Sequence, residues 1–181
     1  MKALSIEHSK FAYLADFAVY LAAILLLLFL LVHFAPPRVW PGIAIAVVAG
    51  LAGWSLIEYA MHRLVFHGME PFRRMHGEHH RRPQALIATP TVLSAALIMA
   101  FVWLPATLVA GIWSGWGATL GAITGYFAYG VVHHAVHHWR SRSVWMQRRK
   151  RLHAIHHRFP HYNYGVTMSL WDRVFRSGKE Q

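Results

Sequence analysis

The apolar run FAYLADFAVYLAAILLLLFLLVHF at residues 11–34 decides the fold class of this chain of 181 residues. It is longer than the roughly 20 apolar residues that a helix needs to cross the hydrocarbon core of a bilayer, and Asp16 is its only acidic residue. Three further apolar stretches follow it, at residues 42–60, 91–110 and 117–132. We therefore predict an all-α integral membrane protein with four transmembrane helices.

Prolines and glycines mark the turns between the predicted helices. Pro36 and Pro37 end the first helix because proline lacks an amide donor and clashes with the preceding turn, and Pro41 can begin the second. The segment GIWSGWG at 111–117 has three glycines and two tryptophans, which suits a turn at a membrane interface. The four helices are therefore expected to form two tight hairpins.

Basic residues gather in the segments that this topology places on one side of the membrane. Of the 18 lysines and arginines, all except Arg38 precede the first predicted helix, lie between the second and third, or follow the fourth. Cytoplasmic segments of membrane proteins carry such an excess. We therefore predict that both termini are cytoplasmic, in a bacterial inner membrane or the endoplasmic reticulum. The first ten residues have no convincing cleavage site, so we expect them to be retained.

The composition excludes several classes of protein and site. The net charge of +11 is explained by membrane orientation and by attraction to anionic lipid headgroups, so nucleic acid is not an expected partner. The absence of cysteine excludes disulfides, iron–sulfur clusters and thiolate haem ligation. No linker or low-complexity segment divides the sequence, so we predict a single domain over residues 1–181.

Histidine is several times more frequent than usual and lies in short clusters on the predicted cytoplasmic face. The spacing HxxHH occurs twice, in HGEHH at 76–80 and HAIHH at 153–157, and HRLVFH at 62–67 gives HxxxxH. Helical residues three and four apart share a face, so each HxxHH is expected to aim three rings at one point. Imidazole is the commonest protein ligand of Zn, Cu, Ni and Fe, so the clusters predict a metal site.

A fourth cluster, HHAVHH at 133–138, contains the spacing HxxxH in two registers. His133 pairs with His137, or His134 pairs with His138, and the spacing alone leaves both registers open.

The number of clustered histidines predicts two metal ions. Ten imidazoles exceed what one ion binds, because tetrahedral zinc takes four ligands and octahedral iron takes six. Two ions with five nitrogens each would keep an open position for oxygen or substrate, and neutral nitrogen ligands suit divalent iron that binds O2. We therefore predict a cytoplasmic, histidine-rich helical cap that holds two iron ions, with O2 as co-substrate. Such a site would also accept zinc during purification.

The other five histidines have no place among the ten clustered ligands. We expect His8 and His33 to be structural, and His134, His138 and His161 to contact the ligands rather than the metal.

Two carboxylates near the clusters each have alternative roles. Glu58 precedes His62 by four residues, so it either accepts the second ring N–H of that histidine or pairs with Arg63 or another arginine. Asp172 either contacts a ligand in the same way or caps a terminal turn, and the cap is the simpler role. The stretch HYNYG at 161–165 is expected to turn the chain back toward the metal.

Three stretches, WSLIEYAMHRLVFH at 54–67, MHGEHHRRP at 75–83 and LHAIHHRFPHYNYGVTMSLWDRVF at 152–175, resemble the fatty-acid hydroxylase and sterol desaturase superfamily, and within it the fatty-acid 2-hydroxylases. The resemblance covers roughly residues 50–176. It implies a dinuclear metal centre on the cytosolic face of four membrane helices and favours the His133 register. The ligands that it implies are His62, His67, His76, His79, His80, His133, His137, His153, His156 and His157.

The resemblance also implies a function. It indicates a membrane-bound di-iron monooxygenase that hydroxylates a lipid acyl chain drawn from the bilayer, with C2 of a fatty acyl group as the candidate position. Eukaryotic 2-hydroxylases often carry a fused haem domain, whereas about ten residues precede the first predicted helix here. We therefore expect a separate electron donor, either a ferredoxin or a b-type cytochrome with its reductase.

Two alternatives stay open. Within the same superfamily, the chain would be a carotenoid or sterol hydroxylase or desaturase, although YGVTMSLWDRVF at 164–175 favours the acyl and sterol branch. In a different class, it would be a non-catalytic membrane protein that binds metal or haem. Histidines collected at one membrane surface are a poor match for a transport path through the helices.

Overall fold

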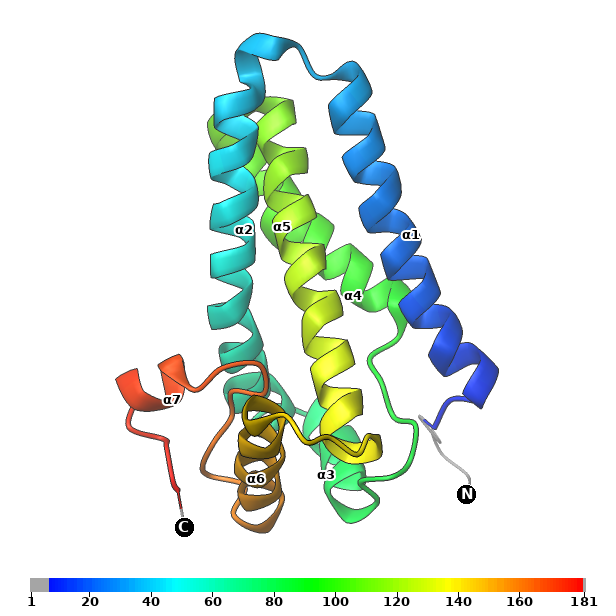
Figure 1. The fold of residues 1–181 in the computed structure, drawn as a ribbon, viewed down its shortest axis with the longest axis vertical. Helices are drawn as coiled ribbons and strands as arrows, with labels where there is room; N and C mark the ends of the chain where they lie inside the picture. The colour runs from blue at the N-terminus through cyan, green and yellow to red at the C-terminus, as the bar shows by residue number, and fades with distance from the viewer. Residues whose placement is uncertain (1–6, 181) are drawn as a thin grey trace. The chain divides into compact units, whose positions relative to one another are not determined.

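The computed structural model describes residues 7–180, and helices form its elements (Figure 1). In chain order they are α1 (Lys10–Phe34), the 3-10 helix η1 (Pro37–Val39), α2 (Trp40–Ala60), the π-helix η2 (Met61–Phe66), α3 (Phe72–Arg81), α4 (Thr91–Ile98), the π-helix η3 (Met99–Trp103), α5 (Leu104–His138), α6 (Val144–Arg158) and α7 (Leu170–Val174). The predicted all-α fold is confirmed for the described residues.

The chain divides into two compact units. The histidine unit comprises Ser55–Ala85 and the chain from Ala128 onward, together with Glu7. The apolar unit comprises His8–Trp54 and Leu86–Phe127. A single domain over residues 1–181 stays a prediction.

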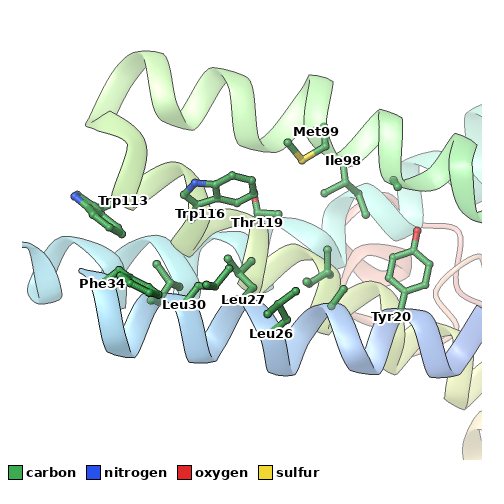
Figure 2. A pocket seen from close by; sticks show the side chains of 14 residues that line it. Tyr20, Leu26, Leu27, Leu30, Phe34, Ile98, Met99, Trp113, Trp116 and Thr119 are labelled. Atoms are coloured by element: carbon green, nitrogen blue, oxygen red, sulfur yellow. The ribbon is translucent and has the colours of Figure 1, made fainter. Parts of the chain in front are cut away.

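Three helical segments are long and apolar enough to cross a membrane: Lys10–Phe34, Pro37–Phe66 and Thr91–His138. The third has 48 residues, and about 72 Å of helix is more than twice the thickness of a hydrocarbon core. Its helix is interrupted at Gly111, where φ is 83° and ψ is 167°, a conformation that favours glycine. The chain reverses direction there, within the turn predicted at 111–117 (Figures 1 and 2). Four crossings stay a prediction.

Small residues allow close helix packing in the apolar unit. A Cβ atom at Gly121 of α5 would lie 2.1 Å from the carbonyl oxygen of Val47 in α2, and one at Gly117 would lie 2.9 Å from that of Ile43. Larger residues would push these helices apart. Close contact between backbones is how helices pack in lipid, where burial of apolar side chains supplies little driving force.

The polar side chains near the start of α1 have hydrogen-bond partners. The Thr91 hydroxyl donates to the Asp16 carboxylate, and the hydroxyl groups of Tyr20 and Ser94 lie 2.7 Å apart. Polar groups at membrane depth need such partners because lipid offers none. The one acidic residue of the first predicted span is therefore accommodated.

An apolar cavity of about 530 Å³ lies within the apolar unit, between α1, α4–η3 and α5 (Figure 2). Leu27, Leu30 and Phe34 line it from α1, and Trp113 and Trp116 line it from α5. Its wall is suited to hydrocarbon rather than to a polar ligand.

The histidine unit places two short helices against the last turns of α5. These helices, α3 and α6, each carry one HxxHH motif, and they come from segments that lie far apart in the chain (Figure 1). On α6 the buried side chains include Leu152, His153 and His156, whereas Arg151 and Arg158 are exposed. One face of the helix therefore packs inward while the basic face remains open to solvent.

Candidate metal centre

The structure brings nine of the ten predicted ligands into two groups within the histidine unit. In each group the candidate ligand atoms all lie within 4.8 Å of one another. The first histidine group contains His62, His67, His76, His80 and His156, and the second contains His79, His133, His137 and His153. The tenth, His157, lies beside both: its Nε2 is 3.1 Å from the Nε2 of His153, and its ring stacks 4.3 Å from that of His80.

Each HxxHH motif contributes to both groups. His76 and His80 join the first group while His79 joins the second, and likewise His156 joins the first and His153 the second. The expectation that each motif aims three rings at one point is therefore wrong. At 100° per residue, the second and third histidines of the motif point about 60° and 40° to opposite sides of the first, so they diverge.

A π-helix brings His62 and His67 together. Five residues of α-helix would place them about 140° apart around the axis. Instead the chain forms η2, in which the His67 N–H donates to the His62 carbonyl at 3.2 Å, and the two ring centroids lie 5.2 Å apart. Single π-turns occur often at functional sites. This turn was not predicted from the sequence, although the HxxxxH spacing is a signal for it.

The ring nitrogens of the first group have the spacing of ligands to a common ion. The Nε2 atoms of His62 and His80 each lie 3.0 Å from the Nε2 of His76, and those of His67 and His156 lie 3.2 Å apart. Two nitrogens bound at right angles to one ion, each about 2.1 Å from it, are about 3.0 Å apart. The residues of the first group therefore fit a metal ion.

The second group fits a metal ion for an additional reason. Its His137 and His153 Nε2 atoms lie 2.8 Å apart. Both ring nitrogens of His79 and the Nε2 of His133 are buried with no hydrogen-bond partner among the described residues. An unsatisfied buried polar group costs about 1–3 kcal/mol, and metal coordination would use the one nitrogen lone pair that each neutral ring offers.

Burial keeps the rings uncharged. Burial, together with the neighbouring histidines, lowers the pKa of His79 to about 2, those of His80 and His156 to about 3, and that of His67 to about 4. At neutral pH these imidazoles are therefore unprotonated, which is the form that binds metal.

Two backbone carbonyls determine which ring nitrogen is available on two ligands. The Nδ1 of His62 lies 2.5 Å from the carbonyl oxygen of Tyr164, and the Nδ1 of His156 lies 2.7 Å from that of Tyr162. A carbonyl only accepts, so Nδ1 carries the hydrogen and Nε2 keeps its lone pair. The stretch HYNYG at 161–165 was predicted only to turn the chain back toward the metal, and the role of its carbonyls was not predicted.

The hydrogen-bond partners of Glu58 and Asp172 differ from those predicted, although Glu58 also interacts electrostatically with an arginine, Arg149. Glu58 accepts hydrogen bonds from the backbone N–H groups of Val166 and Thr167, whereas the ring N–H of His62 goes to a carbonyl. Asp172 lies in the first turn of α7, where it accepts from backbone N–H groups of residues 164–165 and caps no helix. Glu58 was assigned from its spacing to His62 along one helix, but its partners lie more than 100 residues further along the chain.

The remaining histidines lie outside the two groups. The rings of His134 and His138 stack on each other at 4.5 Å, so the His133 register supplies the grouped rings. His161 is exposed, and its charge contributes to lowering the pKa of His67. His8 and His33 bond to the backbone carbonyls of residues 88 and 29, in keeping with structural roles.

Comparisons with known proteins agree with this geometry. The family model for fatty acid hydroxylases matches residues 47–177. A dihydroceramide fatty acyl 2-hydroxylase of Arabidopsis thaliana is 31% identical over 147 residues, which is 75% of this chain and 61% of that protein. A ceramide very long chain fatty acid hydroxylase of Schizosaccharomyces pombe is 35% identical over 144 residues, which is 71% of this chain and 40% of that protein. The chain thus spans about six tenths or less of the length of these relatives.

A solved structure, full-length Scs7p with only its hydroxylase domain visible, has the same fold. It aligns with a TM-score of 0.79 over 93% of this chain and 67% of that chain, at 22% sequence identity. The family match at residues 47–177 contains every residue of both histidine groups. The chain therefore belongs to the fatty acid hydroxylase family.

Proposed function

We propose that the two histidine groups each hold one metal ion, iron in the working enzyme, and that the chain is a membrane-bound hydroxylase of lipid acyl chains. The observation that carries this proposal is the convergence of nine imidazoles with no carboxylate in either group. Neutral nitrogen ligands leave divalent iron with a net positive charge that suits O2 binding. When bound, the irons would activate O2, which is the oxidant for hydroxylation of an unactivated C–H bond.

The chain's own residues keep this centre ready to bind metal. Burial keeps the rings neutral, and the carbonyls of Tyr162 and Tyr164 orient two of them. We assign all ten clustered histidines as ligands, with His157 completing the second group through its contact with His153. Five ligands per ion leave one position of an octahedron open for O2.

We propose C2 of a fatty acyl group as the site of oxidation. The relatives of Arabidopsis thaliana and Schizosaccharomyces pombe are described as a dihydroceramide fatty acyl 2-hydroxylase and a ceramide very long chain fatty acid hydroxylase. The apolar helices support a substrate that comes from the bilayer, with its tail among the helices and its head near the arginines.

We also propose four membrane crossings with both termini on the cytoplasmic side. The reversal at Gly111 divides the third apolar segment into residues 91–111 and 112–138, and each part, about 30–40 Å of helix, is long enough to cross once. The distribution of lysine and arginine supports the orientation.

A separate electron donor completes the proposed reaction, because hydroxylation by O2 needs two electrons from outside the substrate. Exposed arginines of the histidine unit, including Arg142, Arg151 and Arg158, give this donor a basic docking surface. An acidic ferredoxin or a b-type cytochrome with its reductase matches that charge.

Lipid mass spectrometry of producing cells tests the function. Wild type and His33→Ala are expected to yield acyl chains heavier by one oxygen, with fragments that place the hydroxyl at C2 and with label incorporated from ¹⁸O2. His156→Ala, which removes a proposed ligand, is expected to yield none. If iron-loaded wild type with reductant forms no oxygenated lipid, the proposed activity is wrong. Oxygen found at another carbon contradicts only the position.

A further inference from the structure

Residues 162–167, which we call the carbonyl loop, lie between α6 and α7 and contact the first histidine group through main-chain oxygens. As described above, the loop accepts the Nδ1 hydrogens of His62 and His156 and so leaves each Nε2 available for a metal. A displacement of the loop would release both rings. The contacts that hold the loop in place should therefore affect the binding of the metal ion of the first group in particular.

Two buried carboxylates hold the loop by its backbone. Four consecutive N–H groups, those of residues 164–167, all donate to them. Asp172 accepts from the first two at 2.9 Å each, and Glu58 accepts from the last two at 2.8 and 2.9 Å. These side chains are 1% and 4% exposed, so water does not compete for them. Hydrogen bonds to an ionised acceptor are roughly twice as strong as neutral ones.

The remaining contacts of the two carboxylates reinforce this arrangement. The Thr167 hydroxyl donates to Oε2 of Glu58 at 2.6 Å, and the Ser177 hydroxyl donates to Oδ1 of Asp172 at 2.8 Å. Arg149, which is also buried, interacts electrostatically with both acids. The acids are thus anchored from α2 and α7 and leave the loop little freedom.

We propose that Glu58 and Asp172 are positioning residues for the metal ion of the first histidine group, acting through the carbonyl loop. In the second group, both nitrogens of His79 and the Nδ1 of His153 have no hydrogen-bond partner among the described residues. Loss of either carboxylate contact should therefore weaken the binding of the first-group ion and leave the affinity for the second-group ion unchanged. The inference rests on the proposed metal centre but not on the lipid substrate.

The atoms used by each acid give a matched pair of variants. In Asp172 the two loop N–H groups occupy different oxygens. Asparagine keeps one oxygen and turns an NH2 group toward the other N–H, so Asp172→Asn leaves one loop amide without an acceptor. In Glu58 both loop N–H groups donate to Oε1, and the Thr167 hydroxyl donates to Oε2. If glutamine replaces Glu58, its NH2 group takes the place of Oε2, and the Thr167 hydroxyl can rotate to accept a hydrogen bond from it. Glu58→Gln should therefore be tolerated, and Glu58→Ala should not.

The test measures metal content and spectra of the purified full-length protein loaded with ⁵⁷Fe. Wild type is expected to bind two ions per chain. Asp172→Asn and Glu58→Ala are expected to weaken one ion by 10- to 100-fold, the range seen when groups that orient metal ligands are removed. The Mössbauer component that is lost should be the one missing in His156→Ala and retained in His153→Ala. Glu58→Gln and Glu78→Gln, which alters an exposed carboxylate on α3, should keep both ions.

Circular dichroism and gel filtration show which variants keep the wild-type fold. If Asp172→Asn does not fold, Thr167→Val provides the test instead. This variant deletes one hydrogen bond to Glu58 and should weaken the binding of the first-group ion to a smaller degree. If folded Asp172→Asn or Glu58→Ala keeps both ions at wild-type affinity, or loses both ions equally, the inference is overturned. Wild type that binds no metal overturns the proposed centre and this inference with it, whereas two ions without lipid oxidation would overturn only the proposed activity.

Discussion

His133 and His134 are neighbours in the chain and have different surroundings. The ring of His133 lies 4.8 Å from that of His79 in the second group, whereas His134 stacks on His138. We expect His133→Ala to lose the second-group ion and the proposed hydroxylase activity, since it removes one of the four rings of that group. His134→Ala should keep two ions, which metal analysis of both proteins would show. An equal loss in the two variants would contradict the His133 register.

Gly165 lies where the carbonyl loop passes closest to its neighbours. A Cβ atom there would lie 2.0 Å from the Met168 carbonyl oxygen and 2.9 Å from an Asp172 carboxylate oxygen. We expect Gly165→Ala to lower the free energy of unfolding by more than about 2 kcal/mol, measured by thermal or denaturant unfolding. The control is Gly77→Ala on α3, where no atom lies within 4 Å and alanine is the better helix former. Equal stability of the two variants would mean that the carbonyl loop rearranges to accommodate the added methyl group at little cost in free energy.

At the scale of elements, the π-helix η2 decides whether HxxxxH can serve one ion. The chain leaves it at Gly68, where a Cβ atom would lie 2.2 Å from the Leu64 carbonyl oxygen. Gly68→Ala should therefore shift His67 and weaken the first-group ion, as measured by chelator competition. Gly53→Ala on α2, with no atom within 4 Å, is the matched control. Unchanged metal affinity in Gly68→Ala would show that the backbone after η2 can change its conformation without moving His67.

At the scale of the whole molecule, the buried imidazoles make the metal-free protein sensitive to acid. Burial lowers the pKa of His79 to about 2 and that of His156 to about 3, so below the unfolded value of about 6.5 the unfolded chain binds more protons than the folded one. These histidines do not reduce the free energy of unfolding above about pH 6.5. As the pH falls from about 6.5 toward their folded pKa values, each of them lowers the free energy of unfolding by up to about 1.4 kcal/mol per pH unit.

Thermal unfolding of the chelator-treated protein at pH 7 and pH 5 would test this dependence. We expect a markedly lower melting temperature at pH 5, and a higher one at pH 7 once metal is restored, because the ion binds only the folded, neutral rings. A melting temperature that stays constant from pH 7 to pH 5 without metal would mean that the rings are more accessible to water than the structure indicates.

Much of the site follows from spacing, but its division into two groups does not. The clusters at 62–67, 76–80 and 153–157 each mark histidines that we propose as ligands, because repeated histidine spacing on a helix is a local property of the chain. Which rings share an ion depends on how α3 and α6 pack against the end of α5, and this separates neighbouring histidines of one motif. Glu58 shows the same limit, since its hydrogen-bond partners lie more than 100 residues away.

The sequence was sufficient to predict the helical class, the apolar segments and the histidines that we propose as metal ligands, because hydrophobic runs and helical spacing act over a few turns. The division into two histidine groups and the hydrogen bonds from the carbonyl loop to Glu58 were decided by tertiary packing. These features depend on contacts between distant segments, whose geometry emerges when the helices pack and has no signature in any one stretch.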